Sequence, residues 1–243
     1  MALATTDTFD SGVNPDWSAY ASAYDLLSKH NPEYKLLLQD FEDFLASHNS
    51  LQLICDVGGG TGNYTEIAAR ACPGSKVCLI EPDAEMMGAA RAKLRHFGNV
   101  TYQNVPLENA EAAAADLVVC VHALYAMPAP EQRLAEIRRM LKPGGLFYLV
   151  DLGRLMDVAD WRRFLFSSLR KEHGLLGAVR IFWQGREIAK QNKAILTAQK
   201  NGTYWTHSGD ELASAVKAAG FEILRQRPVY RGYSDQIVCR AVE

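Results

Sequence analysis

Three features are absent from this sequence of 243 residues: a long apolar run, a strong net charge and paired cysteines. No apolar stretch approaches the ~20 residues that span a bilayer, so we expect no membrane partner. A net charge of −2 gives no electrostatic case for nucleic acid. The five cysteines form no C-x-x-C pair, and residues 1–10 are polar and acidic, unlike a signal peptide. We therefore expect a reducing, cytoplasmic compartment.

Apolar strand-like runs alternate with helical segments through the middle of the chain. The predicted strands are 51–57, 76–81, 100–105, 116–122 and 146–152. The predicted helices between them are 63–72, 84–97 and 130–141. Strands separated by helices of this length imply right-handed βαβ units and a parallel sheet.

Further elements flank this α/β core. Before it, residues 17–29 and 34–48 are predicted as two helices of an N-terminal cap. After it, Ser208 and Glu211 form a capping-box pattern at the start of a helix over 209–219. The last two predicted strands, 221–230 and 234–242, are so close in sequence that they form a hairpin, and one of them must run antiparallel.

A glycine-rich stretch follows the first core strand, from Asp56 through Gly58, Gly59 and Gly60 to Gly62. Glycines allow positive φ and let a ligand lie against bare backbone, and the next helix offers unpaired N–H groups to an anionic or carboxylate group. The spacing fails the dinucleotide fingerprint G-x-G-x-x-G, and no Lys follows as a P-loop requires. The pattern that fits is D-x-G-x-G-x-G.

Polar residues also close the next two strands. Glu81 comes nineteen residues after Gly62, and a carboxylate there can accept hydrogen bonds from both hydroxyls of a ribose, as it also could from NAD. Asn104 closes the third strand, and its amide oxygen can accept a hydrogen bond. The alternatives are a solvated carboxylate at Glu81 and a plain turn at Asn104.

These motifs resemble those of the class I S-adenosylmethionine (SAM) dependent methyltransferases of small-molecule type. The similarity covers residues 51–152 and includes the Arg138–Gly145 stretch, which resembles the family's R-x-L-K-P-G-G turn. It implies a seven-stranded Rossmann-like sheet, mostly parallel, with helices on both faces. It also implies SAM as cofactor and S-adenosylhomocysteine as product. The implied cofactor-binding residues are Tyr20, Asp56, Gly58, Gly59, Gly60, Glu81, Pro82, Asn104, Val105 and His122.

In this family the acidic residue at Glu81 binds the ribose, and the position of Asn104 is often Asp, which accepts from the adenine amino group. Asn104 departs from that pattern but keeps an acceptor oxygen. The backbone N–H of Val105 would meet an adenine ring nitrogen. An N-terminal tyrosine near the cofactor is common in the family, and packing of the cap is the alternative role for Tyr20.

Methyl transfer from a sulfonium needs an aligned acceptor, and it needs a general base only if the acceptor must lose a proton. His122 and Tyr125 are the candidates, because they follow the fourth core strand, and His122 has a suitable unperturbed pKa. Alternatively, His122 hydrogen-bonds near the homocysteine end of the cofactor. Asp151 and His207 are weaker candidates. No His pair has metal-ligand spacing, so we predict no metal.

Residues 154–205 interrupt the alternation and are predicted to form a mostly helical lid over the ligand-binding edge. The segment holds ten Lys or Arg and four acids, so it carries +6 while the rest of the chain carries −8. It also holds seven aromatic residues. One interpretation is an apolar acceptor pocket in which Arg or Lys pairs with an anionic group of the acceptor. The other is that the aromatics pack the lid while the charges face water.

We predict one methyltransferase domain over 1–243, with a cap (1–48), a SAM-binding core (51–152), the lid (154–205) and a last helix and hairpin (206–243). The predicted reaction is in-line transfer of a methyl group from SAM to an O or N atom of a small, partly aromatic or apolar metabolite, as in natural product biosynthesis. The alternatives are an NAD(P)-dependent oxidoreductase, a nucleic-acid methyltransferase and a SAM-binding scaffold without activity. Nucleic acid is disfavoured because the N/D-P-P-Y motif is missing, and a homodimer is left open.

Overall fold

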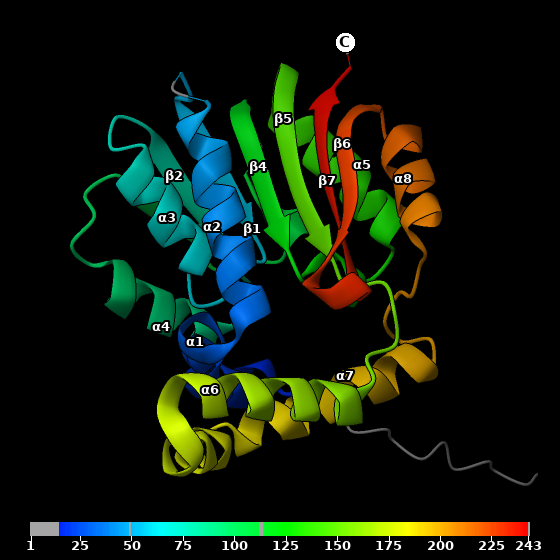
Figure 1. Cartoon of the computed structure of the whole chain (residues 1–243). Coiled ribbons are helices and arrows are strands. Elements are labelled where there is room, and N and C mark those ends of the chain that lie inside the picture. The colour runs from blue at the N-terminus through cyan, green and yellow to red at the C-terminus, as the bar shows by residue number, and fades with distance from the viewer. Residues whose placement is uncertain (1–14, 49, 112–113, 243) are drawn as a thin grey trace, which may run out of the picture.

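The computed structural model describes residues 15–48, 50–111 and 114–242 (Figure 1). Its centre is a seven-stranded sheet with the order β3-β2-β1-β4-β5-β7-β6. The strands are β1 (Leu53–Val57), β2 (Lys76–Ile80), β3 (Val100–Gln103), β4 (Ala115–Val121), β5 (Leu141–Asp151), β6 (Phe221–Val229) and β7 (Ser234–Ala241). Only β7 pairs antiparallel with its neighbours β5 and β6. This confirms the predicted Rossmann-like sheet with one antiparallel strand in a C-terminal hairpin.

Helices cover both faces of the sheet (Figure 1). They are α1 (Trp17–His30), α2 (Pro32–Ala46), α3 (Asn63–Ala71), α4 (Ala84–Leu94), α5 (Pro130–Met140), α6 (Val158–Gln184), α7 (Arg186–Lys200) and α8 (Gly209–Ala218). Because side chains alternate along a strand, Ile54 packs with α2 and α3 while Cys55 packs with α5 and α8. The β1 strand is therefore buried from both sides, as its apolar run predicts.

Strand β5 begins at Leu141, five residues before the predicted start. Leu141 pairs with Ala115, and the register then shifts so that Leu146 pairs with Leu117. The intervening Lys-Pro-Gly-Gly turn bulges out because Pro lacks a ladder N–H and Gly144 takes a φ of 75°. This turn lies at the amino end of β5, opposite the ligand-binding edge, as expected for a structural motif.

The carboxyl ends of the parallel strands meet at one edge of the sheet, and α1, α6 and α7 lie across that edge (Figure 1). Helix α6 breaks at Gly174, whose φ of 70° and ψ of 178° are not helical. The strand order reverses between β1 and β4, and α/β sheets bind ligands at such a switch point.

Within the described ranges, no helix combines the length and apolarity needed to cross a bilayer. All five cysteines are free, and Cys55, Cys78, Cys120 and Cys239 are buried in strands. They behave as small apolar side chains, as their apolar surroundings in the sequence predict.

Candidate active site

The glycine loop after β1 is fixed by close packing at three positions and open at the fourth. A Cβ at Gly58 would lie 2.5 Å from the Cβ of Ala123, so this residue lets the loops after β1 and β4 touch. A Cβ at Gly59 would lie 2.8 Å from the Asp56 carboxylate, and one at Gly62 would lie 2.8 Å from Leu94. Around Gly60 the nearest atom is 3.9 Å away, and its φ is 55°. Gly60 is thus the one glycine of the four at which a Cβ would meet only ordinary contact, with Met86 Sδ.

The Glu81 side chain holds this loop from the neighbouring strand. Its Oε2 accepts from the Gly60 N–H at 3.0 Å, and its Oε1 accepts from the Asp83 N–H at 2.9 Å. Burial raises the pKa of Glu81, and these two amides oppose that rise. A carboxylate has about four lone-pair sites, so each oxygen keeps one for a ribose hydroxyl. The remaining acceptor sites of Glu81 therefore fit the two donating hydroxyls of a ribose beside Gly60.

Asp56 lies below the glycine loop. It is 3% exposed and accepts a hydrogen bond of 2.6 Å from Thr65 Oγ1, which ties β1 to the start of α3. Burial raises its pKa to about 6. A direct contact of Asp56 with the cofactor stays a prediction.

Asn104 follows β3 and is exposed. Its Nδ2 donates to the carbonyl of Glu81 at 2.8 Å and to that of Pro82 at 3.1 Å. These two bonds fix the orientation of the amide and leave Oδ1 able to accept a hydrogen bond. An acceptor is what the adenine amino group requires. Val105 beside it is partly buried. The cofactor roles of Asn104, Pro82 and Val105 remain predictions that this geometry accommodates.

Helix α1 crosses the glycine loop. Asp25 on α1 accepts from Thr61 Oγ1 at 2.8 Å and from Lys93 Nζ at 2.6 Å. Ser18 donates to Asp83 at 2.8 Å. Helix α1 thus covers the loops after both β1 and β2. Tyr20 belongs to this helix, but its side chain lies outside the described residues, so its predicted role stays open.

His122 stands directly after β4 with a positive φ of 52°. Strained backbone of this kind clusters at functional sites. Its Nε2 lies 2.9 Å from Ser234 Oγ, and its ring meets that of Tyr230 edge-on at 4.8 Å. Burial lowers the pKa of His122 to about 4, so its ring is neutral at physiological pH. A neutral ring can accept a proton, but only from a strong acid.

Tyr125 occupies a different environment three residues later. It is 3% exposed, and its ring packs edge-on against Tyr204 at 5.5 Å, in a cluster with Leu152 and Ile195. Its backbone N–H donates to Asp151 Oδ1 at 3.1 Å. These contacts join β4, β5 and α7, which favours a packing role. These packing contacts do not test the catalytic role of Tyr125, which stays a prediction.

Asp151 and His207 form a buried pair behind Tyr125. His207 Nε2 lies 3.0 Å from Asp151 Oδ2, and neither side chain is exposed to solvent. Burial raises the pKa of Asp151, and the contact with His207 opposes that rise. The pair links the end of β5 to the segment before α8. Among the described residues, no group of three or more His, Cys, Asp or Glu side chains could hold a metal ion.

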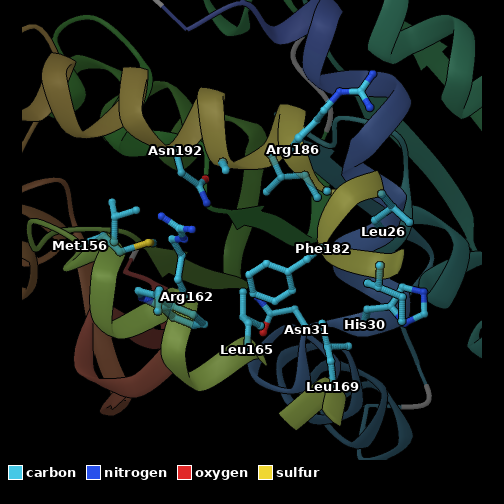
Figure 2. A pocket seen from close by; sticks show the side chains of 16 residues that line it. Leu26, His30, Asn31, Met156, Arg162, Leu165, Leu169, Phe182, Arg186 and Asn192 are labelled. Atoms are coloured by element: carbon cyan, nitrogen blue, oxygen red, sulfur yellow. The ribbon is translucent and has the colours of Figure 1, made fainter. Parts of the chain in front are cut away.

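A cavity of about 370 Å³ lies between α1 and the two lid helices (Figure 2). Its apolar lining includes Leu26, Trp161, Leu165, Leu169, Ile181 and Phe182. Trp161 packs against Tyr230 at 4.7 Å, and Tyr230 in turn contacts His122. Asn31, also in the cavity wall, donates to the Tyr230 hydroxyl at 2.9 Å. His122 itself does not line the cavity: the rings of Trp161, in the cavity wall, and of Tyr230 behind it lie between the cavity and His122.

Polar groups interrupt this apolar wall. Figure 2 shows Arg162 and Asn192 pointing toward one another inside the cavity, whereas the Arg186 guanidinium is turned away from it. Nδ1 of His30 and Nε1 of Trp161 are buried and have no hydrogen-bond partner among the described residues. The sequence does not single out His30, Asn31 or Asn192, because the cavity forms only when α1, α6 and α7 meet.

A family model described as a methyltransferase domain matches residues 29–226, which is most of the chain. The chain therefore belongs to this methyltransferase-domain family. The matched range includes the glycine loop, Glu81, Asn104, His122 and the whole lid. The resemblance to Rossmann-like SAM-dependent methyltransferases is confirmed, and the cofactor of this family, SAM, is the one that the residues around Gly60 and Glu81 fit.

Individual relatives methylate different atoms. The ubiquinone biosynthesis O-methyltransferase of Methylococcus capsulatus is 31% identical over 117 residues, 46% of this chain and 48% of that protein. The ubiquinone/menaquinone biosynthesis C-methyltransferase of Ralstonia pickettii is 27% identical over 143 residues, 56% of this chain and 54% of that protein. This chain spans about half the length of the curated relatives it matches.

Among solved structures, the N-methyltransferase NodS from Bradyrhizobium japonicum in complex with S-adenosylhomocysteine superposes with a TM-score of 0.62. The match covers 93% of this chain and all of NodS, at 14% sequence identity. Likeness at this identity establishes the fold alone.

Proposed function

We propose that this chain transfers the methyl group of SAM to an O or N atom of a small, partly aromatic or apolar molecule by in-line displacement. The observation that carries the proposal is the position of the cavity, which contacts His122 through the rings of Trp161 and Tyr230, at the sheet edge where the glycine loop and Glu81 stand. Neither an oxidoreductase nor a nucleic-acid methyltransferase is favoured by the glycine spacing or by the family.

The chain's own residues would hold the cofactor along the carboxyl edge of the sheet. The loosely packed backbone at Gly60 supports this, Glu81 has lone pairs for the ribose hydroxyls, and Asn104 Oδ1 would accept from the adenine amino group. When bound, SAM supplies a methyl group that is already activated by the positive charge of its sulfonium. The enzyme is then required mainly to position the acceptor and exclude water, and positioning contributes on the order of 7–11 kcal/mol.

The lid cavity is the proposed acceptor site. Its wall is mostly apolar, which suits an aromatic or aliphatic body, and Arg162 and Asn192 supply a cation and an amide. Arg163, the next residue, instead pairs with Asp160 at 3.7 Å on the outside of α6. Arg162 is therefore the arginine that we assign to an anionic or strongly polar group of the acceptor.

His122 is the proposed proton acceptor for an O–H substrate whose reacting oxygen extends from the cavity past Trp161 and Tyr230, because a base must lie within hydrogen-bond reach of the proton. Its pKa of about 4 makes it a weak base, which suffices only once the attacking oxygen has formed its bond to the methyl group and its proton has become strongly acidic. Ser234, 2.9 Å from Nε2, holds the ring. A neutral amine acceptor would need no such help. Tyr125 stays a second candidate.

The direct test incubates the protein with SAM labelled on its methyl group and a metabolite extract, and then identifies the labelled product. We expect label in a small molecule with an apolar body. Two variants separate the parts of the proposal: Glu81→Ala should abolish labelling through weak SAM binding, and Arg162→Glu should reduce labelling with SAM binding intact. Tight SAM binding without any labelled product would instead support a scaffold without activity.

A further inference from the structure

The outer side of the lid carries an apolar stripe in the part of α6 that follows the break at Gly174. The stripe consists of Leu175 (56% exposed), Leu176 (87%), Val179 (52%) and Trp183 (67%). Single exposed apolar residues are normal on any protein surface. Four of them within nine residues form a contiguous patch, and such patches mark interaction sites.

Helix geometry places the four side chains on one side. Residues three or four apart are neighbours on a helix, so Val179 lies between Leu175 and Trp183 along a single row. The opposite side of the same segment is internal: Ile181 lies there and lines the cavity, and Ala178, at the border between the two sides, is fully buried. Figure 1 shows α6 at the end of the molecule opposite the C-terminus, where the turn within α6 projects outward. The stripe therefore faces outward from a protruding element.

Two cations flank the stripe. Between residues 174 and 186 the chain has Arg180 and Arg186 and no acid, and Glu172, before the break, pairs with Lys35 at 3.5 Å. Arg180 lies one helical turn from both Leu176 and Trp183, and it is exposed. The Arg186 guanidinium carbon stacks over the Trp183 ring at 4.6 Å. Apolar side chains that are flanked by cations, with a Trp at their margin, match the chemistry of an anionic lipid surface.

We propose that the apolar stripe docks this protein on an anionic lipid surface. Leu175, Leu176 and Val179 would enter the boundary between headgroups and acyl chains, with Trp183 at the interface and the arginines on lipid phosphates. Such peripheral contact needs no spanning helix. A second copy fits the stripe less well, because a symmetric contact would bring the Arg180 and Arg186 side chains of both copies together.

The stripe and the cavity share one helical segment, with Phe182 inside and Trp183 outside. Docking would therefore hold the lid cavity against the lipid, where apolar small molecules partition. The docking inference itself does not depend on the proposed methyl transfer, because it rests on exposure and charge alone.

The test sediments the full chain with vesicles of phosphatidylcholine alone and of phosphatidylcholine mixed with phosphatidylglycerol. The protein should bind the mixed vesicles, and added salt should weaken binding because surface charges are screened. The double variant Leu176→Ser/Trp183→Ser should reduce the bound fraction about tenfold or more, since each buried apolar side chain favours binding. Arg180→Glu should reduce it as well. The control is Leu224→Ser on β6, a residue that is 44% exposed far from the lid in sequence, and it should change nothing.

Three outcomes overturn the inference. The first is absence of binding to mixed vesicles by the unaltered chain. The second is equal binding by the double variant, provided that its circular dichroism and SAM affinity show an intact fold. The third is a dimer in size-exclusion chromatography that the double variant converts to a monomer, which would assign the stripe to a second copy of this chain.

Discussion

The cofactor edge and the lid cavity lie at the same end of the sheet but are built in different ways. At the edge, Gly60 and Asp83 present backbone N–H groups to one carboxylate, and the residues involved are close in sequence. The cavity is walled by side chains that come from α1, α6 and α7, and residues as distant as Leu26 and Asn192 contribute to it.

The cofactor edge is therefore a general feature of chains that bind the same cofactor, whereas the cavity is particular to this chain. Backbone donors and glycines suit any chain that binds the same cofactor, because they carry no side-chain variation. The cavity is shaped by the sizes and charges of side chains, and so it can differ between relatives that methylate different atoms. Variants at the edge should therefore change SAM affinity, and variants in the cavity should change the acceptor KM.

The largest effect is expected for Gly58→Ala, which tests how rigid the edge is. The new Cβ would lie 2.5 Å from Ala123 at a φ of 66°, so strain and overpacking together should cost about 2–5 kcal/mol of unfolding free energy. SAM binding should be lost with it. Gly74→Ala is the matched control, because nothing lies within 4 Å of its Cβ position. Equal stability of the two variants in urea denaturation would show that the loops after β1 and β4 do not touch as described.

The second effect concerns His122→Asn, since Asn also tolerates positive φ. Loss of a general base should lower kcat by about 10²-fold or more, while SAM affinity changes little. Turnover assays with the identified acceptor would measure kcat, and calorimetry would measure SAM affinity. Tyr125→Phe is the parallel variant. Near-normal kcat in the His122 variant would mean that the ring only supports the site.

The same residue predicts a pH profile. Because burial lowers the pKa of His122 from 6.5 to about 4, the imidazole stays unprotonated until the pH falls through about 4. Activity that depends on the neutral ring should therefore be lost only near that pH, and kcat should show no inflection near 6.5. An inflection near 6.5 that disappears in His122→Asn would contradict the described burial.

A third prediction compares two adjacent arginines. Arg162→Glu puts a negative charge into the cavity and should raise the acceptor KM about tenfold or more, since a charge-assisted hydrogen bond is worth about 1.5–3 kcal/mol. Arg163→Glu should leave KM unchanged, because Arg163 faces outward beside Asp160. Both variants should bind SAM normally. Equal acceptor KM values for the two variants would contradict the proposal that Arg162 pairs with an anionic group of the acceptor.

The smallest effect is expected for Asn104→Asp, the residue that the resemblance implies at this position. In this chain the Nδ2 atom donates to two carbonyls, and a carboxylate cannot donate to them. Loss of the better of these bonds, about 1 kcal/mol, should weaken SAM binding about fivefold by calorimetry. Stronger SAM binding by the Asp variant would show that the two carbonyl contacts do not position the amide.

Sequence patterns predict the sheet and the cofactor edge because both depend on short-range regularities. The run before Asp56 alternates between two helical layers, and the antiparallel β7 follows from the brief link between the last two strands. The sequence pattern did not predict that β5 begins at Leu141, because Pro and Gly normally end a strand rather than form a bulge within it.

The cavity could not be predicted in the same way. The six arginines of the lid look alike in sequence, and the packing of Trp161 on Tyr230 helps to orient α6 so that Arg162 lines the cavity. The contact of His122 with Ser234 joins residues that are 112 positions apart. No local spacing encodes either arrangement.

The measurement that tests the central claim most directly is calorimetric titration of the chain and its Glu81→Ala variant with SAM, S-adenosylhomocysteine and NADH. The intact chain should bind SAM and S-adenosylhomocysteine in the micromolar range and should not bind NADH. The variant should bind SAM about tenfold more weakly or worse, because hydrogen bonds to a charged group are worth about 1.5–3 kcal/mol each. Binding of NADH without SAM, or unchanged SAM affinity in Glu81→Ala, would contradict the assignment of this edge as the cofactor site.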